Sequence, residues 1–200
     1  AKTPRLRNGG TLAVWLACHA LRRGYRATVY TYNLQLFDPV WFQKPSVDLA
    51  EKLRAQEAHK TGSRFHASTR AYLEFLELGG EIRFEDLTAN LLRRYLKRGI
   101  PILTGLSSTY LYQCAREYGP NDDYDDVRGT PSGHFVVLSG YRKDVRSVMV
   151  ADPLHPNPVS EEPYYDVSIE RLIGAILLGV LTYDANLLVI QPREQKKKGN

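Results

Sequence analysis

Two apolar, β-branched runs separated by a short polar segment constrain the fold of this chain more than any other stretch. The first run, residues 135–141, reads FVVLSGY, and the second, residues 147–152, reads SVMVAD. Such runs are typical of β-strands, and the polar pair Lys143-Asp144 between them is typical of a tight turn. The sequence therefore predicts an antiparallel hairpin that extends from Gly133 to Pro153.

Two chemically active side chains are predicted to meet at one end of this hairpin. His134 opens the first strand and Asp152 closes the second, and in an antiparallel hairpin these two positions lie side by side. A carboxylate beside an imidazole fixes the tautomer of the ring and supports its charged form. The pair therefore indicates the base and the orienting residue of a nucleophilic triad. The alternative is a structural histidine followed by a common Asp-Pro turn.

The hairpin and the residues before it resemble one known family. Gly-His-(apolar)4-Ser-Gly-Tyr, a short turn, a strand and Asp-Pro are similar to the His/Asp segment of the papain-like cysteine peptidases of family thirty-nine. These are relatives of the peptidases that remove double-glycine leaders from bacteriocins. The preceding LLRRYLKRGIPILTGLSSTYL resembles the helix, Gly-x-Pro and strand found there, so the resemblance extends from Leu87 to Pro192.

The resemblance implies both a fold and a function. The fold is of the α+β class, a papain-like cysteine peptidase fold in which an N-terminal helical part packs on a C-terminal antiparallel sheet. The function is hydrolysis of a peptide or protein substrate with small residues before the cleaved bond. His134 would be the general base, Asp152 its orienter, and no cofactor is needed.

Local patterns along the chain agree with an α+β division, because helical periodicity dominates the first half and strands the second. We expect the first helix to bury a face made of Leu12, Trp15, Leu16, His19 and Ala20. The segments 116–133 and 154–167 are predicted to be loops, the first a mobile flap beside the site. The expected helices are 12–23, 46–60 capped by Ser46, 63–78, one capped by Asp86 or Thr88 and ending at 97, and 169–178; the expected strands are 26–34, 81–84, 102–107, 109–115 and 186–191.

Composition indicates one globular domain and argues against several classes of partner. The chain has 200 residues, of which 43% are hydrophobic and 24% charged, which suits a single domain with a substantial core. We expect that domain over residues 1–192, helical over residues 1–99 and built on a sheet over residues 100–192, followed by a disordered basic tail at 193–200. The net charge of +5 is dispersed, without the basic and aromatic stripe of a nucleic-acid surface. The longest apolar stretch is too short to span a bilayer, and no signal peptide is evident, so no membrane association is expected.

The two cysteines, Cys18 and Cys114, give neither a disulfide framework nor a metal-binding spacing. A reducing, cytoplasmic compartment is therefore expected, and no metal. A zinc site made of His134, Asp152 and His155 is a weaker alternative. The acidic run at 122–126 lacks the glycine and the distant glutamate of a calcium-binding loop.

The nucleophile that such a peptidase requires is missing from the expected place. In the family it is a Cys-Gly that opens the first helix, with a Gln a few residues before it. When the first predicted helix is aligned with that helix, the position falls near Asn8, which cannot attack. Cys18 is expected to be buried in the middle of the helix, and Cys114 has no helix start near it.

Three interpretations of this absence stay open. GGTLAVWLACHALRRGYRATVY resembles a second helix and strand found in longer relatives, in which case the nucleophile and the Gln lie before Ala1. Alternatively, the chain is a catalytically inactive papain-like module that binds a peptide or protein. A third possibility, cyclase- or ligase-associated chemistry, lacks a phosphate-binding glycine loop. The chain starts with Ala and its sole methionine is Met149, so either the initiator was removed or the chain begins inside a longer product. As it stands, we do not expect it to be active.

Overall fold

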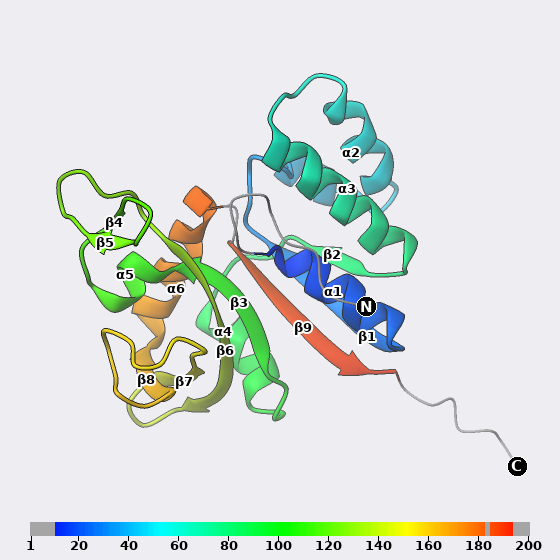
Figure 1. Ribbon diagram of the computed structural model, residues 1–200. Coiled ribbons are helices and arrows are strands. Elements are labelled where there is room, and N and C mark those ends of the chain that lie inside the picture. Colours follow the sequence, from blue (N-terminus) through cyan, green and yellow to red (C-terminus); the bar gives the residue numbers. More distant parts are fainter. Residues whose placement is uncertain (1–10, 183–184, 194–200) are drawn as a thin grey trace, which may run out of the picture.

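Most strands of the described residues form one large mixed sheet. The computed structural model describes residues 11–182 and 185–193, and seven strands of these residues follow the order β2-β1-β9-β3-β6-β7-β8 across the sheet (Figure 1). β2 runs parallel to β1, and every other neighbouring pair in that order is antiparallel. The strands are β1 (Tyr25–Thr31), β2 (Glu81–Arg83), β3 (Ile102–Ser107), β6 (Gly133–Arg142), β7 (Ser147–Ala151), β8 (Tyr164–Ser168) and β9 (Asn186–Pro192), with β4 (Glu117–Tyr118) and β5 (Asp123–Tyr124) as a separate short pair.

Six α-helices of the described residues cover the two faces of this sheet. One layer comprises α1 (Ala13–Arg22), α2 (Leu49–Glu57) and α3 (Ser63–Glu77); the other comprises α4 (Ala89–Leu96), α5 (Ser108–Tyr112) and α6 (Ile169–Leu178). Two 3-10 turns lie at Pro39–Phe42 and Gly179–Thr182. The α+β class expected from the sequence is thus confirmed. Among the helices described, none combines the length and the apolar character needed to cross a membrane.

Alternation of side chains along the central strands divides the interior into two cores. On β9, Leu188 packs with α1 and α3, whereas Leu187 and Val189 pack with α4 and α6. On β1, Val29 and Tyr30 divide in the same way. These strands are buried on both faces because consecutive residues of a strand point to opposite sides.

The predicted hairpin is confirmed as β6 and β7. Its strands are joined by four turn residues, Lys143 to Arg146, and Arg146 adopts a left-handed φ of 50°. The pairing shifts by one residue between Leu138 and Gly140, which places a β-bulge in β6. Beyond the bulge the register continues to Val137 and Ala151, close to the end of the hairpin that carries His134.

The expectation of a strand over 109–115 is wrong, because this segment begins with the short helix α5. The Ser107 hydroxyl accepts a hydrogen bond from the Tyr110 amide at 3.3 Å, so a serine cap starts a helical turn directly after β3. The turn ends at Gln113, which has a left-handed φ of 55°. Of the aromatic residues that suggested a strand, Tyr112 is buried in the core and Tyr110 is 40% exposed.

The expectation of a loop through residue 167 is also wrong at its end, because β8 pairs with β7 from Ser147↔Ser168 to Ala151↔Tyr164. Three smaller differences concern helix starts and faces. α2 begins after Asp48 rather than Ser46, since the Asp48 carboxylate accepts from the next helical amides. α1 begins after Leu12 without a side-chain cap. Because α1 packs on both β1 and α3, its buried residues are Ala13, Val14, Ala17, Cys18, Ala20 and Leu21. Of the predicted face, Ala20 is buried in the helix and Leu12 directly before it, whereas Trp15, Leu16 and His19 are partly exposed.

Candidate functional site

The structure brings His134 and Asp152 together at one end of the β6–β7 hairpin. His134 is the second residue of β6 and lies opposite Leu106 of β3, and Asp152 directly follows the last residue of β7. His134 Nε2 and Asp152 Oδ1 are 2.7 Å apart. The Asp152 amide also donates to the Pro163 carbonyl oxygen at 2.8 Å, which ties the end of β7 to the start of β8. Strand pairing therefore brings both residues to one end of the hairpin, where their side chains meet.

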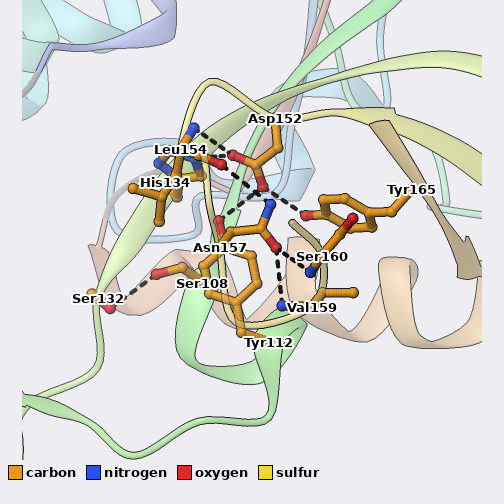
Figure 2. Close-up of polar contacts among 10 residues, drawn as sticks. All are labelled: Ser108, Tyr112, Ser132, His134, Asp152, Leu154, Asn157, Val159, Ser160 and Tyr165. Atoms are coloured by element: carbon orange, nitrogen blue, oxygen red, sulfur yellow. Dashed lines mark hydrogen bonds and ion pairs between the residues drawn. The ribbon is translucent and has the colours of Figure 1, made fainter. Parts of the chain in front are cut away.

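The Asp152 carboxylate is enclosed by four hydrogen-bond donors (Figure 2). Oδ1 accepts from His134 and from the Leu154 amide, the latter at 2.9 Å. Oδ2 accepts from the hydroxyl of Tyr112 on α5 at 2.8 Å and from that of Tyr165 on β8 at 2.6 Å. The Asp152 side chain is 0% exposed, whereas that of His134 is 24% exposed, so solvent reaches the imidazole and not the carboxylate.

The loop after Asp152 is fixed by a second set of contacts. Asn157 donates from Nδ2 to the Leu154 carbonyl oxygen at 3.2 Å. Its Oδ1 accepts from the amides of Val159 and Ser160 at 2.9 and 3.0 Å. Asn157 thus holds the peptide units next to the Leu154 amide that donates to Asp152, as Figure 2 shows.

The hydrogen bonds keep Asp152 ionised although it is buried. Burial alone raises the pKa of this carboxyl, but donation from His134, Tyr165, the Leu154 amide and Tyr112 outweighs that effect and lowers the pKa to about 2. Burial, followed by the hydrogen bond to Asp152, raises the pKa of Tyr112 and of Tyr165 well above the usual range. Both phenols are therefore neutral donors at physiological pH.

An ionised carboxylate can only accept hydrogen bonds, and this assigns the proton on the ring of His134. Nε2 must carry a hydrogen to donate to Asp152 Oδ1, so Nδ1 is the basic nitrogen of the neutral imidazole. The ring of Tyr112 lies beside the imidazole, with the two centroids 6.3 Å apart. This arrangement suits proton transfer at Nδ1, with Asp152 stabilising the imidazolium that forms.

Sequence reasoning missed Tyr112 and Tyr165 because both lie in segments whose structure was predicted wrongly. Tyr165 belongs to YYDVS, whose alternating pattern is a strand signal that the preceding prolines obscured. A third strand beside β7 would have placed it near Asp152. Tyr112 offered no comparable signal, because its position depends on the direction of the short helix α5.

The two cysteines, Cys18 and Cys114, lie in different surroundings, one buried and the other partly exposed. Cys18 is 1% exposed in α1, its thiol points to the Ala71 carbonyl oxygen at 3.8 Å, and burial raises its pKa. This confirms the expected core role. Cys114 follows the left-handed Gln113 at the end of α5 and lines a cavity of about 420 Å³ with Ser107 and Pro131. Asn8, the position aligned with the family's nucleophile, lies outside the described residues, as does the predicted tail from residue 194 onward.

The residues of the alternative zinc site, His134, Asp152 and His155, are not gathered into a group of three possible ligands. Throughout residues 11–182 and 185–193, no three His, Cys, Asp or Glu side chains are arranged to hold a metal ion. His155 is exposed in the loop after Asp152. In the acidic loop, Asp125 accepts instead from the side chain and amide of Arg128 and from the amide of Val127.

Comparisons with known proteins point to one family. The model of the Peptidase_C39-like family matches residues 35–171, which include the whole hairpin and Asp152 but begin after α1 and β1. No curated protein matches the chain. A crystal structure from Bacillus anthracis, assigned as a C39-like peptidase, is 17% identical with a TM-score of 0.32. The alignment covers 55% of this chain and 50% of that one, so the chain spans half the length of that protein.

Proposed function

Because the chain belongs to the Peptidase_C39-like family, we propose that it hydrolyses peptide bonds, with His134 as general base and Asp152 as its orienter. The observation that carries this proposal is the 2.7 Å contact between His134 Nε2 and the fully buried Asp152 carboxylate. A carboxylate held by four donors gives the imidazole one fixed tautomer. That is the property a general base needs beside a thiol.

In the proposed reaction, His134 Nδ1 takes the proton of a cysteine thiol and the thiolate attacks the carbonyl carbon of the scissile bond. The C–N bond then breaks, and the Nδ1 proton passes to the leaving amine, which leaves a thioester. Water gives a proton to Nδ1 and attacks this thioester, and return of the proton to sulfur releases the acid and restores the thiol. Asp152 stays ionised throughout, because its oxygens accept from the donors around it.

Cys18 and Cys114 are the two cysteines of this sequence, and we propose that neither of them is the nucleophile. The thiol is then supplied by a residue that is missing from this sequence. The substrates we propose are peptides with small residues before the cleaved bond, of the kind that bacteriocin-leader peptidases process. Two free cysteines fit a reducing compartment, and we place the activity in the cytoplasm.

A second candidate is a papain-like module that binds a peptide or protein partner without cleaving it. The observation that favours it is the position of the two cysteines, one in the core and the other at the end of a helix. In this case the His134–Asp152 pair has only a structural role. Binding would then be insensitive to the protonation of the imidazole.

The full gene product that contains this chain separates the two candidates. It is incubated with synthetic peptides that carry Gly-Gly or Ala-Gly at a central position, and cleavage is followed by mass spectrometry. We expect cleavage that is lost in His134→Ala and in protein whose thiols are blocked with iodoacetamide, and retained in the matched control Cys18→Ser/Cys114→Ser. Peptides that bind but stay intact, with equal affinity for wild type and His134→Ala, would establish the binding module instead.

A further inference from the structure

Two phenol hydroxyls converge on a single oxygen of the buried carboxylate. Tyr112 and Tyr165 donate to Asp152 Oδ2 at 2.8 and 2.6 Å, and they come from α5 and β8, which lie on opposite sides of the residue in sequence. Tyr112 is only 8% exposed. Such convergence of separate elements on one buried group requires both elements to be placed accurately.

The four contacts together fix the rotation of the carboxylate. Oδ1 is used by His134 and by the Leu154 amide, so the two tyrosines are the donors that satisfy Oδ2. A turn about the Cβ–Cγ bond of Asp152 would break hydrogen bonds at both oxygens. A buried oxygen left without a donor destabilises the folded state, and more so when it is charged.

We infer that Tyr112 and Tyr165 are positioning residues that hold the Asp152 carboxylate, ionised and in one orientation, against His134 Nε2. Without the two hydroxyls, Oδ2 is buried with no donor, and the carboxyl group takes up a proton or turns away. Either change weakens the acceptor for Nε2–H, and the imidazole then populates the tautomer with its hydrogen on Nδ1. That tautomer cannot accept a proton at the nitrogen that faces away from Asp152.

Nuclear magnetic resonance of the full gene product tests this inference without any need for activity. The Asp152 carboxyl carbon is titrated with pH in protein labelled with ¹³C-aspartate, and the His134 tautomer is read from the ¹⁵N shifts of the ring. In Tyr112→Phe/Tyr165→Phe we expect the carboxyl titration to move up by about one pH unit or more. We also expect signal from the Nδ1–H tautomer, which is absent in wild type, and a smaller effect in each single variant.

Matched controls separate this effect from a general loss of hydroxyl groups. Tyr164→Phe alters the neighbouring residue of β8, which is 61% exposed, and Tyr110→Phe alters a residue of α5 that is 40% exposed. Both controls should titrate as wild type does. Phenylalanine preserves the packed ring, and circular dichroism checks that the double variant remains folded. An unchanged carboxyl titration and an unchanged tautomer in the folded double variant would overturn the inference.

The catalytic consequence rests on the proposed function, and the two can fail separately. If the protein cleaves peptides, the double variant should lower kcat by on the order of tenfold to a hundredfold while KM stays constant. If wild type cleaves nothing but the tautomer shifts in the double variant, the proposed function falls and the positioning role stands. If the double variant cleaves at the wild-type rate, the positioning role is refuted and the proposed function stands.

Discussion

At the scale of single residues, Asp152 is the group on which the site depends. A carboxylate loses much of its hydration when its side chain is fully buried, and that loss costs several kcal/mol unless donors replace the water. Here the donors are one imidazole, two phenols and one backbone amide, and the net result is a pKa of about 2. The hydrogen bonds therefore outweigh the desolvation, and the ionised form stabilises the folded protein.

The low pKa of Asp152 predicts how stability changes with pH. An aspartate in the unfolded chain has a pKa of about 3.9, so this group contributes about 2–3 kcal/mol of stability above pH 5. Because the folded-state pKa is the lower of the two, that contribution is lost as the pH falls from about 4 through about 2. Urea unfolding at a series of pH values should show a difference in the free energy of unfolding between wild type and Asp152→Asn. This difference should become smaller as the pH falls over this range.

Carboxylates other than Asp152 are present in both proteins, so their effects cancel from the difference in the free energy of unfolding. Asp144→Asn, which alters an exposed carboxylate in the hairpin turn, is the matched control for the loss of one acidic group. If the free energies of unfolding of wild type and Asp152→Asn differ by the same amount from pH 5 to pH 2, the assigned role of the four donors is contradicted.

The four side chains of the site differ in how far they could be predicted from the sequence. His134 and Asp152 were identified because strand pairing brings both residues to the same end of one hairpin. Tyr112 and Tyr165 reach Asp152 through the placement of α5 and β8, which depends on packing between distant segments. Local patterns gave no signal for the packing of α5, so Tyr112 could not be found from them, whereas the strand signal around Tyr165 was obscured by the preceding prolines.

At the scale of elements, the short helix α5 controls one side of the site. Five residues are too few for a helix to be stable by itself, so its start must be held by tertiary contacts and by the Ser107 cap. Ser107 also ends β3, opposite Gly133 of β6. The same residue therefore fixes the strand beside His134 and the helix that carries Tyr112.

Removal of the Ser107 cap should destabilise the protein and loosen Tyr112. Ser107→Ala removes the oxygen that accepts from the Tyr110 amide, and we expect a loss of about 1 kcal/mol in the free energy of unfolding, measured in urea. Ser107→Thr keeps the oxygen that accepts from the Tyr110 amide and should retain the stability that the cap provides. Equal stability of the alanine variant and wild type would show that the cap contributes nothing.

Element boundaries were predictable where one local signal dominated. The range of α6, Ile169–Leu178, was predicted residue for residue, and Thr88 caps α4 as one of the two expected residues. Prediction failed for α5 because a strand-like composition competed with a serine cap. For α1, the periodicity of large apolar residues indicated one buried face, whereas packing against both a sheet and α3 buries residues outside that face, such as Val14, Ala17 and Leu21.

At the scale of the whole molecule, β9 connects two cores that the sheet separates. It lies between β1 and β3, and its consecutive residues Leu187 and Leu188 enter opposite cores. Both tryptophans of the sequence, Trp15 and Trp41, pack against the core that contains Leu188. A probe of tryptophan environment thus reports directly on one core only.

This separation permits a test of cooperativity. Leu187→Ala removes a fully buried side chain from the core without tryptophans and should cost about 2–5 kcal/mol. If the two cores unfold as one unit, tryptophan fluorescence should follow this loss, with the same urea midpoint as far-ultraviolet circular dichroism. Leu188→Ala, in the other core, is the matched control. Tryptophan fluorescence that is indifferent to Leu187→Ala but responds to Leu188→Ala would show two independent units.

The position of β9 also sets the order in which the molecule can be completed during synthesis. β9 follows the other eight strands in the sequence and yet lies between β1 and β3. While β9 is still inside the ribosome, β1 and β3 each lack their neighbour and expose an unpaired strand edge. Edges of this kind recruit other chains. The sheet can close only after residue 192 has emerged, so both of these edges stay unpaired until that stage of synthesis.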